Sequence, residues 1–277
     1  MTSSPQEYLH GYRPEERERL HRQARFLEPA VHDRLPYRRR KRLLEVGCGV
    51  GAQTEILLRH FPEVHVTGID INQEQLAEAR RFLGTVPWAH DRAGPRYDIL
   101  EMDAQKLELD PESFDSAFLC WILEHVPSPQ RVLGEVRRVV APGGPIVCSE
   151  VLNATFFIDP YSPSTLRYWM AYNDRQIEMH GDPFVGAKLG NLLSSVGFRD
   201  VTTEVKTFHL DNRAPGERAE FLEYWTDLLL SGAPALLEAG RVSQDVVADM
   251  TRELDRVARD PNSVFFYSFI QARARAW

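Results

Sequence analysis

The chain has 277 residues, enough for one large hydrophobic core with an appendage, and its hydrophobic and charged fractions of 43% and 26% are those of an ordinary soluble globular protein. The formal charge of −7 would repel a phosphate backbone, which argues against a nucleic-acid partner. Cys48, Cys120 and Cys148 are odd in number, which indicates a reducing compartment, and no apolar run approaches the length that a bilayer needs. We therefore expect a cytoplasmic protein with no membrane or nucleic-acid partner and no metal.

The N-terminal segment predicts one helix preceded by a polar arm. Residues 14–32 carry apolar side chains at helical spacing. The arm contains Tyr8 and Tyr12, and two interpretations stay open: the arm covers a ligand, or it packs against the body. We expect residues 1–36 to form a helical lid on a main domain at residues 37–277.

Residues 43–54 (LLEVGCGVGAQT) are the most informative stretch, because an apolar run ends in three alternating glycines. The pattern predicts a buried strand, a tight turn and the start of a helix. Without Cβ atoms, this backbone can take positive φ angles and approach a ligand at a helix N-terminus. Gly47, Gly49 and Ala52 also match the dinucleotide pattern G-x-G-x-x-G/A, so the loop alone fits two cofactors.

Acidic residues end or occupy the next predicted strands. Asp70 follows the strand at residues 64–69, and Asp103 follows the strand at 97–102. Ligands of doubly wound sheets bind outside the carboxyl ends of the strands, so Asp70 is placed to bind ribose hydroxyls, a role that is compatible with capping the next helix. Glu45 lies inside the first strand, where it could instead organise the loop by accepting N–H bonds.

The fourth strand, residues 114–120, runs directly into polar groups. His125 there has a near-neutral intrinsic pKa and is a candidate general base, with a structural role as the alternative. A helix at 130–140 and a strand at 145–150 follow. Strands and helices thus alternate strictly, which predicts a parallel sheet covered on both sides.

The pattern changes at an aromatic insertion, residues 151–183, which we expect to line or cover the crevice, with a plain packing cluster as the alternative. The chain then predicts a helix at 184–196, a strand at 201–209, a helical insertion at about 212–260 and a last strand at 263–270. The predicted substrate-binding residues are Phe157, Tyr161, Tyr168, Trp169 and Tyr172.

The order of motifs resembles the class I S-adenosylmethionine-dependent methyltransferases, in their ubiquinone/menaquinone-biosynthesis-like branch. The residues that carry this resemblance are 45–51 (EVGCGVG), Asp70, the Asp103–Ala104 pair, 123–126 (LEHV) and 133–144 (LGEVRRVVAPGG). It covers residues 40–150 in detail. It implies a Rossmann-like doubly wound α/β fold whose seven-stranded sheet is mostly parallel with an antiparallel last strand, plus helical lid insertions, and S-adenosylmethionine as cofactor.

The resemblance also implies roles for single residues. The glycines would approach the methionyl and ribose portion of the cofactor, Asp70 its ribose, and Asp103 with Ala104 its adenine. Cys120 and Trp121 would lie near the transferable methyl group. The complete predicted cofactor set is Tyr8, Tyr12, Glu45, Gly47, Cys48, Gly49, Gly51, Asp70, Ile71, Asp103, Ala104, Cys120 and Trp121.

The predicted function is methylation of a small molecule at oxygen, nitrogen or carbon. A nicotinamide-dependent oxidoreductase and a non-catalytic S-adenosylmethionine-binding protein are the alternatives. The insertion favours a planar or a cationic acceptor, and a cation would also use nearby carboxylates, namely Asp159, Asp174 or Glu178. If a proton must leave the acceptor, the candidate bases are His125, His180 and His209.

Overall fold

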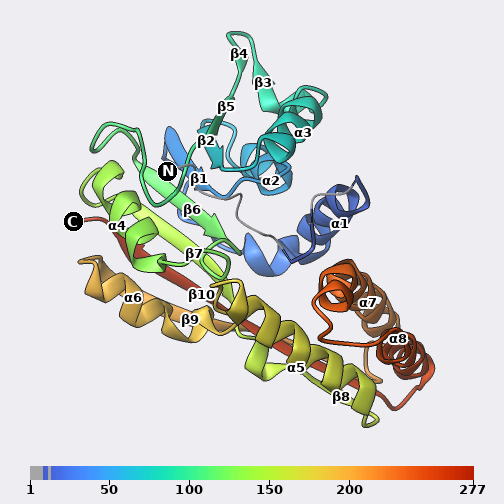
Figure 1. Ribbon diagram of the computed structural model, residues 1–277. Helices are drawn as coiled ribbons and strands as arrows, with labels where there is room; N and C mark the ends of the chain where they lie inside the picture. Colours follow the sequence, from blue (N-terminus) through green and yellow to red (C-terminus); the bar gives the residue numbers. More distant parts are fainter. Residues whose placement is uncertain (1–8, 12–13) are drawn as a thin grey trace.

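A mixed eight-stranded sheet runs through the molecule, with helices on both faces (Figure 1). The computed structural model describes residues 9–11 and 14–277. The strands of the sheet are β1 (Arg42–Val46), β2 (His65–Asp70), β5 (Tyr97–Glu101), β6 (Ser116–Cys120), β7 (Pro145–Val151), β8 (Phe157–Asp159), β9 (Arg199–Leu210) and β10 (Val264–Arg275). A separate hairpin consists of β3 (His90–Asp91) and β4 (Gly94–Pro95).

The helices cover this sheet and its extension. They are α1 (Pro14–Val31), α2 (Ala52–His60), α3 (Gln73–Leu83), α4 (Pro129–Val139), α5 (Pro163–Glu178), α6 (Leu189–Ser195), α7 (Pro215–Glu238) and α8 (Gln244–Arg259), with short 3-10 turns η1 (Pro87–Ala89), η2 (Asn153–Thr155) and η3 (Val185–Lys188). Within the described ranges, no helix combines the length and the apolar character that crossing a bilayer requires.

The strand order is β5-β2-β1-β6-β7-β10, which confirms the doubly wound fold. The first five strands are parallel, and β10 is antiparallel to both β7 and β9. Leu43 and Leu44 are fully buried neighbours in β1, yet they belong to different core clusters. Successive strand side chains point to opposite faces, so the sheet has a core on each side.

The last strand is longer than its sequence pattern predicts, because β10 continues to Arg275. Gln271 and Arg273 interrupt the apolar run there, but β7 and β9 pair with both edges of the strand and override its weak propensity. The first part of β10 extends past β7 and pairs with β8, through Phe265 and Ile158. β8 is the strand beyond the seven expected.

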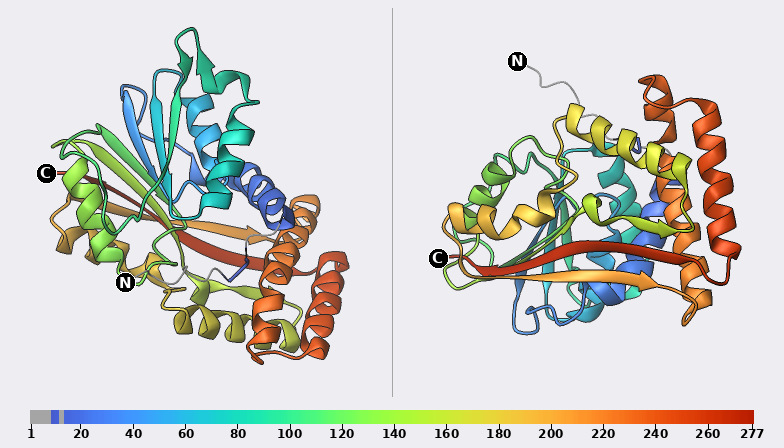
Figure 2. Two further views of the ribbon diagram at one scale, coloured as in Figure 1. Left: turned by 45° about the horizontal axis from the view of Figure 1, so that its top comes forward. Right: turned by 90° about the horizontal axis from the view of Figure 1, so that it is seen from below.

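The two insertions meet on this extension. α5 comes from residues 151–183, and α7 with α8 comes from residues 212–260. The three helices pack around the first part of β10, and α1 lies between them and the glycine-loop side of the sheet (Figure 2). Segments far apart in sequence therefore enclose one space at the carboxyl ends of the parallel strands.

Candidate active site

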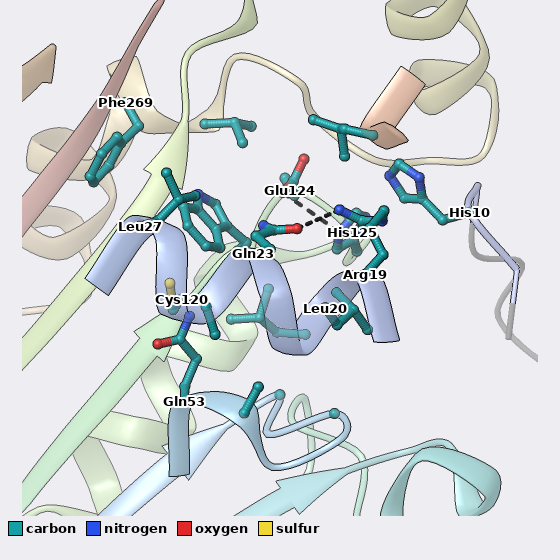
Figure 3. Close-up of a pocket in the computed structure, with 18 of the residues that line it drawn as sticks. His10, Arg19, Leu20, Gln23, Leu27, Gln53, Cys120, Glu124, His125 and Phe269 are labelled. Atoms are coloured by element: carbon teal, nitrogen blue, oxygen red, sulfur yellow. Dashed lines mark hydrogen bonds and ion pairs between the residues drawn. The ribbon is translucent and has the colours of Figure 1, made fainter. Parts of the chain in front are cut away.

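A cavity of about 230 Å³ lies where β1, β2 and β6 end, with α1 crossing it (Figure 3). Its loop half contains seven of the predicted cofactor residues: Gly47, Cys48, Gly49, Asp70, Ile71, Cys120 and Trp121. Its other half, which we call the ring half, is formed by aromatic side chains of α5, β9, α7 and β10: Trp169, Tyr172, Phe208, Phe221, Tyr224, Trp225, Tyr267 and Phe269.

Asp70 joins the glycine loop to the end of β2. Its carboxylate accepts the N–H of Gly49 at 3.0 Å and the N–H of Asn72 at 2.9 Å. Asn72, rather than Asp70, caps α3 through the Gln75 N–H at 2.9 Å. Burial raises the pKa of Asp70 above its ordinary value, although both N–H bonds act in the opposite direction. The capping interpretation of Asp70 is therefore wrong.

Gly51 and Glu45 are not in the cavity wall. Gly51 has φ +78°, and a Cβ there would come within 3.2 Å of Ala79 and of Leu83, so this glycine allows α2 to start against α3. Glu45 is buried and accepts the hydroxyl of Thr54 at 2.5 Å, and burial raises the pKa of Glu45 to about 8. The structure therefore places Glu45 behind the cavity wall, bonded to the first turn of α2.

Asp103 and Ala104, the predicted adenine-side pair, differ in position, because only the first lines a hollow. Asp103 lines a second hollow of about 250 Å³, which shares Ile71 with the main cavity. Asp103 is exposed and accepts the N–H of Gln105 at 2.8 Å. Ala104 lines neither hollow.

Glu150 organises the segment after β6 and was missed by sequence reasoning. Its Oε1 accepts the N–H groups of Ile122 at 3.0 Å and Leu123 at 2.7 Å, while Trp121 is held at φ +53°. That φ is strained for a bulky side chain, and these bonds support it. Burial raises the pKa of Glu150 well above its ordinary value. An acidic residue ending a buried strand was the available signal.

Of the three candidate bases, His125 alone lines the cavity. Its Nε2 lies 3.6 Å from Oε1 of Glu124 (Figure 3). Glu124 is buried, accepts Nε2 of Gln176 at 2.7 Å, and has a pKa raised by burial. His180 and His209 are exposed and do not line the cavity.

Two of the five predicted substrate residues, Trp169 and Tyr172, line the cavity. The expectation for the other three is wrong. Tyr168 is fully buried and donates its hydroxyl to the carbonyl of Leu229, whereas Phe157 and Tyr161 are 53% and 72% exposed. In β8 it is the alternate residue, Ile158, that faces inward.

The rest of the ring half comes largely from the second insertion and from β9 and β10. The insertion's aromatic residues were visible in the sequence, but no local pattern shows that they face the same space as α5. The missed residues are Phe208, Phe221, Tyr224, Trp225, Tyr267 and Phe269.

The carboxylates proposed for a cationic acceptor do not reach this space either. All three are exposed and absent from the cavity wall, and they are Asp159, Asp174 and Glu178. On α1, the buried Arg19 guanidinium donates to both carboxylate oxygens of Glu16, at 2.7 and 2.6 Å. The two charges neutralise each other at this part of the wall.

Tyr8 and Tyr12 lie outside the described residues. His10, between them, is described and lines the cavity. Its Nε2 lies 2.8 Å from the Tyr172 hydroxyl, and its Nδ1 lies 2.5 Å from Oγ of Ser231. Burial, followed by the nearby Arg19 charge, lowers the pKa of His10 well below its ordinary value, so the ring is neutral at pH 7.

A doubly wound sheet, a glycine loop held by an acid at the end of the second strand, and a cavity above the strand ends define an α/β enzyme that binds a nucleoside-containing cofactor. The family model described as a methyltransferase domain matches residues 44–148. The ubiquinone/menaquinone biosynthesis C-methyltransferase UbiE of Methylobacterium nodulans is 32% identical over 205 residues, 72% of each chain.

One further relative and one solved structure of similar fold extend the comparison. The 24-methylenesterol C-methyltransferase 2 of Oryza sativa is 36% identical over 143 residues, 50% of this chain and 37% of that protein. A phosphoethanolamine N-methyltransferase 2 of Haemonchus contortus, solved with S-adenosylhomocysteine, superposes with a TM-score of 0.55 at 18% identity, covering 92% of this chain and 52% of that one. The chain belongs to the class I S-adenosylmethionine-dependent methyltransferases, in the ubiquinone/menaquinone-biosynthesis-like branch.

The cofactor is therefore S-adenosylmethionine, and the loop half of the cavity fits it. The Asp70 carboxylate in the wall is an acceptor for hydroxyl protons, and the thiol of Cys120 with the Trp121 ring provides a weakly polar surface farther along. Burial raises the pKa of Cys120 well above its ordinary value, so this thiol is neutral. A neutral thiol is a poor nucleophile and would not compete with the acceptor for the methyl group of the cofactor.

Proposed function

We propose that this methyltransferase acts on a neutral, planar, largely apolar small molecule, bound in the ring half of the cavity. The observation that carries the proposal is the continuous aromatic wall next to the loop half, contributed by four separate elements. Aromatic walls gain from offset-stacked or edge contacts with a flat ligand. The Arg19–Glu16 pair is internally neutral, so the wall contributed by α1 does not favour a strongly charged acceptor.

Two relatives support an acceptor of this kind, whereas the structurally similar phosphoethanolamine N-methyltransferase is named for a charged substrate. One is a C-methyltransferase of ubiquinone and menaquinone biosynthesis, and another is a sterol C-methyltransferase. We propose carbon or oxygen as the methylated atom and small-molecule metabolism as the setting.

When bound, S-adenosylmethionine supplies a methyl group on a positively charged sulfur, which is already a reactive electrophile. The protein's task is then to orient the acceptor and to exclude water. We assign orientation to the ring half, ribose binding to Asp70, and the adenine side to Ile71 with Asp103. His125 would take the proton that the acceptor loses, since it lies in the wall beside Glu124.

The N-terminal segment is proposed as a lid. Five residues of α1 line the cavity, and His10 reaches it from the preceding arm. The lining residues of α1 are Arg19, Leu20, Gln23, Ala24 and Leu27. We also propose the cytoplasm as the compartment, because the three cysteines form no disulfide.

Labelled S-adenosylmethionine incubated with fractionated metabolite extracts tests the acceptor class. The expected product is an apolar ring compound that partitions into organic solvent, is heavier by one methylene than its precursor, and forms in smaller amount with the Asp70→Ala variant at a subsaturating cofactor concentration. Label found only in cationic, water-soluble products would overturn the proposal.

A further inference from the structure

The indole of Trp225 is a buried hydrogen-bond donor without a partner. Its side chain lines the cavity and is 2% exposed, and Nε1 has no hydrogen-bond partner among residues 9–11 and 14–277. An indole nitrogen donates and cannot accept, and leaving it buried and unpaired is unfavourable. Other buried side-chain atoms of the described chain are also unpaired, but none of their residues lines this cavity.

Neighbouring rings hold the Trp225 indole in place. Phe156 stacks on it with centroids 5.1 Å apart, Phe265 meets it edge-on at 5.2 Å, and Tyr267 lies at 4.8 Å. These rings come from two segments, the residue before β8 and strand β10, and they pack on the indole so that it has little freedom to turn toward another acceptor. Trp225 is one of the residues that line the cavity, so a ligand bound there is the acceptor that we consider.

Two nearby donors in the same wall are already used. The indole N–H of Trp169 donates to the carbonyl of Asn153 at 3.0 Å, and the hydroxyl of Tyr267 donates to Oδ1 of Asn153 at 2.9 Å. The wall therefore satisfies these two donors internally while it leaves that of Trp225 unpaired. This difference distinguishes Trp225 from Trp169 and Tyr267.

We infer that Trp225 determines acceptor specificity by donating its indole N–H to an oxygen of the methyl acceptor. The acceptor class is then a flat apolar molecule that carries a carbonyl-type oxygen. This inference rests on the proposed function, because it takes the ring half as the acceptor site. A site that pairs a buried donor rejects an analogue lacking the oxygen, since the donor would again be unpaired.

Two probes of one shape test the inference on protein saturated with S-adenosylhomocysteine. 2-Acetylnaphthalene and 2-isopropenylnaphthalene differ by replacement of a carbonyl oxygen with a methylene group. Calorimetry is expected to show about fivefold tighter binding of the ketone by the wild type, the effect of one neutral hydrogen bond. Trp225→Phe is expected to bind both probes about equally.

Trp88→Phe is the matched control. Its indole is 43% exposed, donates to Glu55 and lies outside the cavity wall, so the ketone preference is expected to persist. Indole ¹⁵N–¹H spectra give a second measurement, with five tryptophans in the sequence. The Trp225 resonance is expected to move downfield with the ketone and not with the alkene. Single substitutions of the other four assign it even if Trp225→Phe does not fold.

The outcomes separate the two proposals. Equal binding of both probes by the wild type, or a ketone preference that survives in Trp225→Phe, overturns the role of Trp225 and leaves the acceptor site intact. Binding of neither probe overturns the proposed apolar acceptor site, and the role of Trp225 with it.

Discussion

The hydroxyl of Tyr172 on α5 lies 2.8 Å from Nε2 of His10, across 162 positions of sequence. The direction of this hydrogen bond follows from its neighbours. The Ser231 hydroxyl donates to the carbonyl of Leu228 at 2.8 Å, so its oxygen accepts from Nδ1–H of His10. In a neutral ring Nε2 is then an acceptor, and Tyr172 donates to it.

This pair is expected to couple the N-terminal arm to α5. Tyr172→Phe removes the hydroxyl that donates to Nε2 of His10, and His10→Ala removes the acceptor, so each change is expected to lower the free energy of unfolding by about 1–3 kcal/mol. The double variant should lose less than the sum, by about 0.5 kcal/mol or more. Urea denaturation of the four proteins measures this coupling. Additive losses would show that the two groups do not interact, and Tyr161→Phe, at an exposed ring, serves as the neutral control.

Asp70→Ala is expected to weaken S-adenosylhomocysteine binding by roughly 1.5–3 kcal/mol, about 10- to 150-fold. The variant loses a charged acceptor in the wall and also the bond that holds the Gly49 N–H. Isothermal titration calorimetry measures the change. Asp98→Ala, which removes an exposed carboxylate bonded to His65 on the same sheet, should keep wild-type affinity. Unchanged binding by the Asp70 variant would remove this residue from the cofactor site.

His125→Gln is expected to lower kcat by about 10²- to 10⁴-fold while S-adenosylhomocysteine affinity stays constant, because the proposed role concerns the acceptor's proton. The labelled-cofactor assay gives kcat, and calorimetry gives the affinity. His209→Gln at an exposed position should match the wild type in both. Full activity in His125→Gln would mean that positioning suffices and that no base is needed at this place.

Because His32 is buried in its neutral form, the fold is expected to lose stability in acid. Its ring is 4% exposed, Nε2 contacts Oε1 of Gln53 at 2.6 Å, and burial lowers its pKa to about 4. The unfolded chain takes up the proton near pH 6.5, so stability is lost as pH falls from 6.5 to 4, by about 3 kcal/mol in total. Urea denaturation at pH 7 and pH 4.5 is expected to show a smaller difference for His32→Phe than for the wild type.

The pH dependence of stability must be compared between variants and the wild type, because the pKa shift of Glu45 changes stability in the direction opposite to that of His32. The pKa of Glu45 is raised to about 8, so its contribution is present at low pH and is lost as pH rises toward 8. Glu45→Gln is therefore the companion variant, with a steeper loss of stability on acidification. Equal pH dependence of His32→Phe and the wild type would show that His32 does not carry the effect.

The sequence by itself determined the features that depend on neighbouring residues. Turn chemistry and strand spacing located the glycine loop and put Asp70 beside it, and strict alternation predicted the parallel sheet. The resemblance carried by residues 40–150 added the cofactor and the class of enzyme, and both are confirmed. These inferences succeed because the determining contacts lie within a few residues or between consecutive strands.

Most of the ring half of the cavity was decided only by the tertiary structure. Phe157 and Tyr267 are both aromatic residues of strands, yet the first is exposed and the second lines the cavity. Gly51 makes room for α3, whereas Gly47 and Gly49 of the same glycine loop line the cavity, and the sequence does not distinguish the three. Which side of an aromatic helix or strand faces the cavity depends on how α5, α7 and α8 pack together beside β10, and these segments are up to about a hundred residues apart.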